Sequence, residues 1–167
     1  AGIRAIAIVF LHGYRHPAHE RQAAELARDI GFTQISVSHQ ISPLMKLVGR
    51  GDTTVVDAYL SPILRRHIDR VASELGQTRL LFMQSNGGLA DARHFQGKDS
   101  ILSGPAGGIV GAARAAARAG FDKIITFDMG GTSTDVAHYA GKYERAFDTL
   151  VAGVRLRAPM LHVHTVA

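Results

Sequence analysis

The feature that most constrains the fold is a pair of adjacent glycines between strand-like segments. Residues 126–137 read TFDMGGTSTDVA, with Gly130 and Gly131 at the centre. Three segments predict strands: 123–127, 135–140 and 142–147, the last two separated by Ala140 and Gly141. The glycine pair is therefore expected in the turn of a β-hairpin. In a P-loop or a dinucleotide-binding fingerprint the glycine loop opens a helix, so this pattern fits neither.

The same hairpin carries groups suited to a phosphate and a metal ion. Adjacent glycines let backbone N–H groups approach an anion closely. An aspartate at the end of a strand can hold a divalent ion through water beside those phosphates. The candidate residues are Asp128, Gly130, Gly131, Thr132, Ser133, Thr134 and Asp135. This order predicts a nucleotide-phosphate site, and the alternative is a plain tight turn flanked by polar residues.

The hairpin resembles the second phosphate loop of the actin-like ATPases, whose phosphate loops are turns between antiparallel strands. Five blocks of sequence extend the resemblance to the hydantoinase A/5-oxoprolinase family, in that family's order and spacing. They are AIAIVFLHGYRHPAH from residue 5, TTVVDAYL from 53, MQSNGG from 83, LSGPAGGIVGA from 102 and ITFDMGGTSTDVA from 125. Together the blocks cover most of the chain.

The resemblance implies a fold and a domain organisation. The expected class is α/β: a partial actin-like ATPase (ribonuclease H-like) fold, with crossover α/β units followed by an antiparallel phosphate-loop hairpin. Residues 1–48 would be the carboxyl-terminal end of the N-terminal hydantoinase/oxoprolinase region. Residues 49–167 would begin the hydantoinase A domain. The chain has no initiator methionine and ends where the family pattern runs on, so we expect an internal segment of a longer polypeptide.

The resemblance also implies an activity. Members of the family are ATP-dependent ring-opening amidohydrolases, together with related ATP-using carboxylase subunits. The implied cofactors are ATP and Mg²⁺ or another divalent cation. The implied partners are a small cyclic amide or imide substrate and a hydantoinase B-type subunit or domain. Alternatives are a small-molecule kinase of actin-like fold and a non-catalytic nucleotide-binding module. The chain alone is expected to turn over little or no ATP.

Roles follow residue by residue from the resemblance. Asp128 would position Mg²⁺ through water, and the Gly130 and Gly131 amides with the Thr132 hydroxyl would hold the β- and γ-phosphates. Asp135 would orient water or another metal ligand. ATP would then phosphorylate the amide oxygen of the substrate ring.

A second metal ligand follows from the end of the chain. The family pattern there is Asp-x-His-Thr, so His164 matches and gives the second candidate. His162 departs from the pattern, and Ala167 stands where a glycine is expected. Since His162 and His164 are two residues apart, both imidazoles would lie on one side of a strand.

Two further glycine-rich segments are candidates for the nucleotide site. Ser85, Asn86 and Gly87 follow a predicted strand at 79–83, where open α/β sheets bind ligands, although a plain turn is an equal alternative. A helix is predicted over 104–119, with Ser103 as its N-cap. Its small residues, among them Gly104, Gly107 and Gly108, would let another backbone approach closely. Such an approach would serve either the closing of a nucleotide cleft or simple tight packing against the sheet.

The remaining elements are predicted from the spacing of apolar residues and from residues that end helices and strands. A strand over 4–11, a helix over 17–30 and a strand over 34–38 predict a crossover unit. Residues 41–52 read as loop, and a helix begins at Thr54 with apolar side chains on one face. Pro62 predicts a kink or two abutting helices in it. Residues 90–99 are expected to form a short helix or irregular link. A strand is predicted over 151–157, Pro159 would interrupt the chain after it, and residues 161–166 alternate as in a further strand.

Composition excludes several classes. The 167 residues include no cysteine, which excludes disulfides, thiolate nucleophiles and cysteine-based zinc sites. The formal charge is +5, but the 19 Lys and Arg are scattered, so we expect no nucleic-acid partner. No apolar run approaches the roughly eighteen residues that a membrane helix needs. We therefore expect no membrane partner and a cytoplasmic location.

Overall fold

The structure is a computed structural model that describes residues 2–166. The chain divides into two compact units. The first comprises the residues up to Leu80, together with Gln96–Lys98 and Asp148–Ala158, and the second comprises Leu81–Phe95, Asp99–Phe147 and the chain from Pro159 onward. Ala167, where the family pattern has glycine, lies outside the described residues. Among those described, no helix is both long and apolar enough to cross a membrane.

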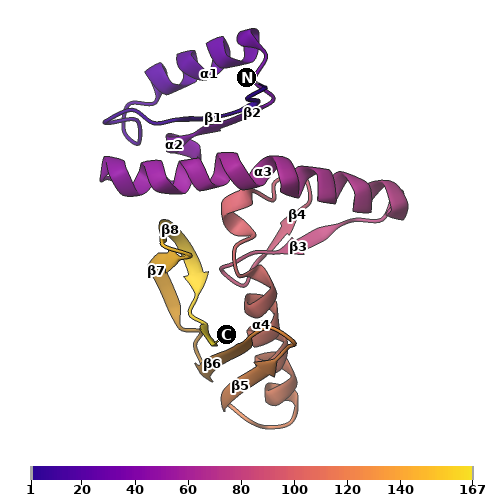
Figure 1. The fold of residues 1–167 in the computed structure, drawn as a ribbon. Coiled ribbons are helices and arrows are strands. Elements are labelled where there is room, and N and C mark those ends of the chain that lie inside the picture. Colours follow the sequence, from indigo (N-terminus) through magenta and orange to yellow (C-terminus); the bar gives the residue numbers. More distant parts are fainter. Residues whose placement is uncertain (1, 167) are drawn as a thin grey trace. The chain divides into compact units, whose positions relative to one another are not determined.

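The first unit begins with the predicted crossover. β1 (Ala5–Ile8) pairs in parallel with β2 (Gln34–Val37), and α1 (Ala18–Ile30) connects them (Figure 1). Ala24 and Ala27 of α1 pack on Ile8 and Val37, which forms a small core. Gly31 ends α1 in the left-handed conformation, at φ 104°. The strand–helix–strand prediction is confirmed, although β1 ends three residues before position 11.

The loop predicted over residues 41–52 is wrong, because most of it is helical. α2 (Ser38–Ile41) is followed by α3 (Leu47–Leu75), which begins seven residues before the predicted start at Thr54. Gly49 is buried, and a Cβ added there would lie 2.5 Å from Cδ of Arg157. A close tertiary approach therefore accounts for this glycine, and packing overrides its low helix propensity. α3 runs through Pro62 as one helix, so the alternative of two abutting helices is wrong.

The buried side of α3 is more polar than the sequence predicted. Tyr59 and Ile63 belong to the predicted apolar face of this helix, but they are 73% and 54% exposed. Buried instead are Arg50, Thr53, Thr54, Asp57, Ala58 and Ile68. These polar groups are satisfied by hydrogen bonds. Asp57, for example, accepts from Ser36 Oγ at 2.7 Å and from the Lys98 amide at 3.1 Å.

A buried polar network ties the end of β1 to α1 and α2. The fully buried Glu20 accepts hydrogen bonds on Oε1 from Ser38 Oγ and the Phe10 amide, and on Oε2 from the His39 amide and Nδ1. The equally buried Arg50 donates from Nε to Ser38 Oγ at 2.8 Å. Burial acts to raise the pKa of Glu20, but these hydrogen bonds outweigh it and lower the pKa below its usual value.

The second unit starts with a hairpin, β3 (Leu81–Met83) and β4 (Leu89–Asp91), which pair antiparallel. Residues 84–88 are therefore a hairpin turn and do not follow a strand of a parallel sheet. The link predicted over 90–99 is partly strand and ends in the 3-10 turn η1 (Gly97–Asp99), which belongs to the first unit except for Asp99. α4 (Ser103–Arg118) follows, and its N-cap is Leu102 at φ 56°. Ser103 makes no capping hydrogen bond, so its predicted N-cap role is wrong.

The rest of the second unit is an antiparallel sheet packed on α4 (Figure 1). β5 (Lys123–Met129) pairs with β6 (Thr134–Ala140), and β6 pairs with β9 (His164–Val166). Ala106 and Ile109 of α4 pack against Ala137 of β6 and Leu161. Along β5 the side chains of Ile125, Phe127 and Met129 are 75%, 66% and 68% exposed. The β-hairpin predicted from the glycine pair is confirmed.

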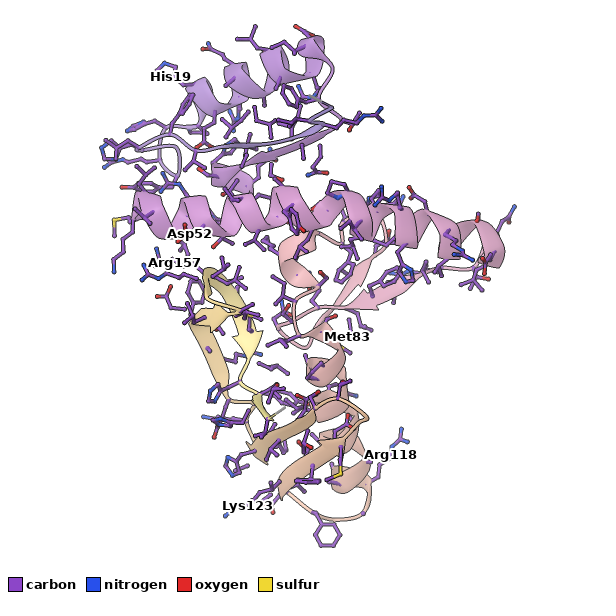
Figure 2. The ribbon with its side chains drawn as sticks, viewed as in Figure 1. His19, Asp52, Met83, Arg118, Lys123 and Arg157 are labelled. Carbon is purple, nitrogen blue, oxygen red and sulfur yellow. The ribbon has the colours of Figure 1, made fainter. Side chains whose placement is uncertain are left out.

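One more pair of strands crosses the division between the units. β7 (Arg145–Val151) and β8 (Val154–Leu161) form a two-stranded sheet. Pro159 lies inside β8, so the predicted interruption is wrong. A proline needs only a position where no ladder N–H is required, which a two-stranded sheet offers on its free edges. Arg157, labelled in Figure 2, donates from Nε to Asp148 at 2.9 Å.

Candidate functional site

The glycine turn joins β5 to β6 with its backbone partly unpaired. Met129 pairs with Thr134, and the Gly130 amide donates to Ser133 O at 2.9 Å. Within residues 2–166, the amides of Gly131 and Thr132 make no hydrogen bond. Neither glycine has a positive φ, and a Cβ on Gly131 would meet nothing within 4 Å. The turn geometry therefore does not itself require glycine at 131, and two N–H groups beside it are free to donate.

Two carboxylates lie side by side just below this turn. Asp128 of β5 is the direct partner of Asp135 of β6, so both side chains lie on the same face of the sheet. Asp135 is in turn the partner of Thr165 on β9, and Thr165 Oγ1 donates to Asp135 Oδ1 at 2.6 Å. Like charges directly opposite each other destabilise a sheet, so this pair favours a cation between or beside the two groups.

A cavity lies between α4 and the face of the sheet that carries Asp128 and Asp135. Its volume is about 390 Å³, and both aspartates line it. The other lining residues are Pro105, Gly108, Ile109, Ala112, Ile124, Ile125, Thr126, Phe127, Ala137 and Val163. None of these described residues is Lys or Arg, so the lining itself supplies no cationic side chain to the two carboxylates. The cavity is thus acidic at one end and apolar along the rest.

The predicted glycines of α4 lie at different places. A Cβ on Gly108 would be 3.8 Å from Asp128 Oδ2, which puts this glycine at the acidic end of the cavity. A Cβ on Gly107 would be 3.5 Å from Cγ of Met83, which Figure 2 labels. One on Gly104 would meet nothing within 4 Å. The structure therefore brings only Gly108 of the three next to the carboxylates.

Ser85, Asn86 and Gly87 lie in the β3–β4 turn, where each has a partner inside the protein. The buried Ser85 donates from Oγ to Asp99 O at 2.7 Å. Asn86 Oδ1 accepts from the Gly88 amide at 2.7 Å. Gly87 has φ 81°, and a Cβ there would lie 2.9 Å from Cδ1 of Leu161. None of the three is among the described residues that line the cavity.

His164 is on the other face of the sheet from the carboxylates. It pairs with Val136, and neighbouring residues along β6 point to opposite faces. Its ring lies 4.4 Å from the ring of His162, so the two imidazoles are close, as the spacing predicted. Within residues 2–166, no three His, Asp or Glu side chains are grouped as metal ligands. The structure thus brings Asp128 together with Asp135 and not with His164.

The carboxylate of Glu144 lies between His138 and His162. Glu144 Oε1 lies 2.9 Å from His138 Nδ1, and its Oε2 lies 3.5 Å from His162 Nδ1. Hydrogen bonds from His138 and then His162 lower the pKa of Glu144. Neither this cluster nor Thr165 beside Asp135 was predicted from the sequence. The pairing of β9 with β6 creates the Thr165 contact, and nothing in the local pattern reveals that register.

Comparisons with known proteins identify the family of the chain. Residues 50–167 match the family model described as Hydantoinase/oxoprolinase. The chain is 44% identical over 176 residues to 5-oxoprolinase of Saccharomyces cerevisiae, which covers 100% of this chain and 13% of the yeast protein. It is 35% identical over 171 residues to caprolactamase subunit alpha of Pseudomonas jessenii, covering 98% of this chain and 25% of that subunit.

Two solved structures share the fold. The nucleotide-free structure of acetone carboxylase, an enzyme of ATP-dependent acetone carboxylation, superposes with a TM-score of 0.84 at 25% identity, over 98% of this chain and 24% of the other. ATP-dependent caprolactamase from Pseudomonas jessenii gives 0.82 at 34% identity, over 98% of this chain and 25% of the other. The chain therefore spans a quarter or less of these relatives, and on both sequence and fold it belongs to the hydantoinase/oxoprolinase family.

Proposed function

We propose that this chain contributes part of the ATP phosphate-binding site of an ATP-dependent enzyme that opens cyclic amides. The relatives named 5-oxoprolinase and caprolactamase support that reaction class. Because the chain spans 13% to 25% of them, the complete site would be built in a longer polypeptide. In it, residues 1–48 would end an N-terminal region and residues 49–167 would begin the hydantoinase A domain.

The observation that carries the proposal is that two unpaired backbone N–H groups of the turn lie beside unoccupied space. The Gly131 and Thr132 N–H groups are unpaired within residues 2–166, and no protein atom lies where a Gly131 side chain would project. Backbone amides in a turn form a concave donor set that suits a phosphate oxygen. Since the Gly130 amide is already bonded to Ser133 O, the donors assigned to the phosphates are those of Gly131 and Thr132, with the Thr132 hydroxyl.

The two carboxylates fit a magnesium ion. Mg²⁺ keeps several waters and takes one or two carboxylates plus phosphate oxygens, and Asp128 and Asp135 supply that number on one face. When bound, the ion would neutralise charge on the phosphates of ATP. Asp128, which accepts no hydrogen bond from the described residues, would be the group nearest the ion. His164 is on the opposite face, and we do not assign it to this site.

In this proposal the turn amides and the two aspartates have separate roles. The turn amides hold the phosphates, Asp128 positions the metal ion, and Asp135 orients a water molecule at the same face. Positioning and charge neutralisation supply most of the catalysis in phosphoryl transfer. The cyclic amide and a hydantoinase B-type subunit would meet this phosphate site from elsewhere in the longer enzyme.

The test is binding of a non-hydrolysable ATP analogue with Mg²⁺, followed by amide chemical shifts in a ¹⁵N-labelled chain. The largest shifts are expected at Gly131 and Thr132. Gly131→Ala adds a methyl group where the structure is empty, so folding should be unchanged while analogue affinity falls about tenfold through steric conflict with the phosphate. Gly111→Ala is the matched control, since a Cβ there also meets nothing within 4 Å. Equal affinity of wild type and Gly131→Ala would refute phosphate binding at this turn.

The reaction class needs a second assay on the longer enzyme. ADP release should be stimulated by a lactam or an imide such as 5-oxoproline or hydantoin. Stimulation by a sugar instead would identify a kinase, and binding without stimulated turnover would identify a nucleotide-binding module.

A further inference from the structure

We infer that Thr165 is a positioning residue for Asp135, holding one carboxylate oxygen so that the other stays available to the metal ion or its water. This inference rests on the proposed phosphate and metal site. It adds a residue to that site which lies 30 positions along the chain from the aspartate.

The register places Thr165 in line with the carboxylates. Asp128, Asp135 and Thr165 are successive partners across β5, β6 and β9, so their side chains form one row on the face toward α4. The row lies just below the glycine turn, because the next pair toward the turn is Met129 with Thr134. A change at Thr165 therefore acts on the carboxylate side of the cavity and not on the turn amides.

The hydrogen bond from Thr165 determines which carboxylate oxygen of Asp135 is available to a metal ion. Thr165 Oγ1 donates to Oδ1 at 2.6 Å, the range of a charge-assisted O–H···O⁻ bond. A hydroxyl has a single proton, so this threonine cannot donate to a phosphate while it holds Asp135. Oδ2 accepts no hydrogen bond from the described residues. The donor thus selects which oxygen faces a cation, and partners of this kind orient metal-binding carboxylates in many sites.

Threonine suits this task better than a longer polar side chain. Its branched Cβ restricts χ1, so the hydroxyl is held in place by the strand itself. Asp128 has no comparable donor among the described residues, which leaves its carboxylate free to follow the ion. The two aspartates therefore have different roles: Asp135 is oriented before the ion binds, and Asp128 can adapt to the position of the ion.

The test compares Thr165→Val, which keeps the shape and removes the donor, with Thr165→Ser, which keeps the donor. Affinity for the ATP analogue is measured as a function of Mg²⁺ concentration. We expect Thr165→Val to weaken the apparent Mg²⁺ affinity about tenfold, the low end for loss of an outer partner of a metal ligand. Binding of the metal-free analogue should not change, and Thr165→Ser should recover most of the loss. Thr33→Val, which removes an exposed hydroxyl that donates to Arg4 O at 3.4 Å, is the control.

A second readout needs no nucleotide. Three-bond couplings should show one χ1 rotamer for Asp135 in the wild type and in Thr165→Ser, and averaged rotamers in Thr165→Val. A fixed rotamer and unchanged Mg²⁺ dependence in Thr165→Val would overturn the role of Thr165 while leaving the proposed function intact. Absence of any Mg²⁺-dependent analogue binding by the longer wild-type enzyme would overturn both.

Discussion

Replacing Glu20 by glutamine should destabilise the first unit, although the two side chains have nearly the same shape. The Glu20 carboxylate accepts four hydrogen bonds, two on each oxygen, and its side chain is fully buried. A glutamine amide offers one oxygen and one NH₂, so whichever way it is placed, one backbone N–H, that of Phe10 or of His39, meets another donor. The Ser38 hydroxyl and the His39 ring can each accept instead, so they need not lose a partner. A hydrogen bond to a charged group contributes about 1.5–3 kcal/mol, so losing one at this fully buried carboxylate predicts a loss of about 1.5–3 kcal/mol in the free energy of unfolding.

The assay is denaturant unfolding followed by far-UV circular dichroism at pH 7. Glu25→Gln is the matched control, because Glu25 lies on the same helix, is exposed and makes none of these bonds. The pKa of Glu20 is lowered in the folded chain, so its stabilising contribution is complete above the unfolded value near 4.3 and is lost as the pH falls through the folded pKa. The difference between wild type and Glu20→Gln should therefore narrow below about pH 4. A loss under about 1 kcal/mol at pH 7, or a difference that widens in acid, would refute the reasoning.

The remaining predictions test close packing and an unsatisfied hydroxyl. Gly13→Ala would place a Cβ 2.2 Å from Oε1 of Glu20, so the same unfolding assay should show a loss of about 1–3 kcal/mol, and a neutral result would show that the carboxylate can move. Thr149 Oγ1 is buried and has no hydrogen-bond partner among residues 2–166, so Thr149→Val should raise the free energy of unfolding by about 1 kcal/mol. Thr53→Val should lower it, because Thr53 Oγ1 donates to Gly49 O and accepts from the Arg157 amide, both at 2.9 Å.

The hairpin was predictable because its signals are local. Alternation along β5 and β6, with a glycine pair at the centre, specifies strand, turn and strand without reference to the rest of the chain. It also implies that Asp128 and Asp135 are opposite each other, since the turn length fixes the register. The crossover of β1, α1 and β2 was readable for the same reason, because each element ends at a local signal such as Gly31.

What could not be predicted depends on contacts between distant segments. Nothing in GRG at 49–51 signals a helix, because the reason for Gly49 is its approach to Arg157, more than a hundred residues away. Likewise a polar side chain is expected in solvent unless its partner is known, which is why the burial of Glu20 and Arg50 was missed. The separation of His164 from the carboxylates follows from the β6–β9 register, which the sequence does not specify.

The exposed side of β5 has a practical consequence for all of these measurements. β5 lies at an edge of its sheet as described, and Ile125, Phe127 and Met129 are exposed along it, with Lys123 at its start as the charged residue on that face. An unshielded apolar border of this kind is a template on which a second copy can add its own strand. The chain studied alone should therefore self-associate as its concentration rises, so binding titrations should use samples dilute enough to keep it monomeric.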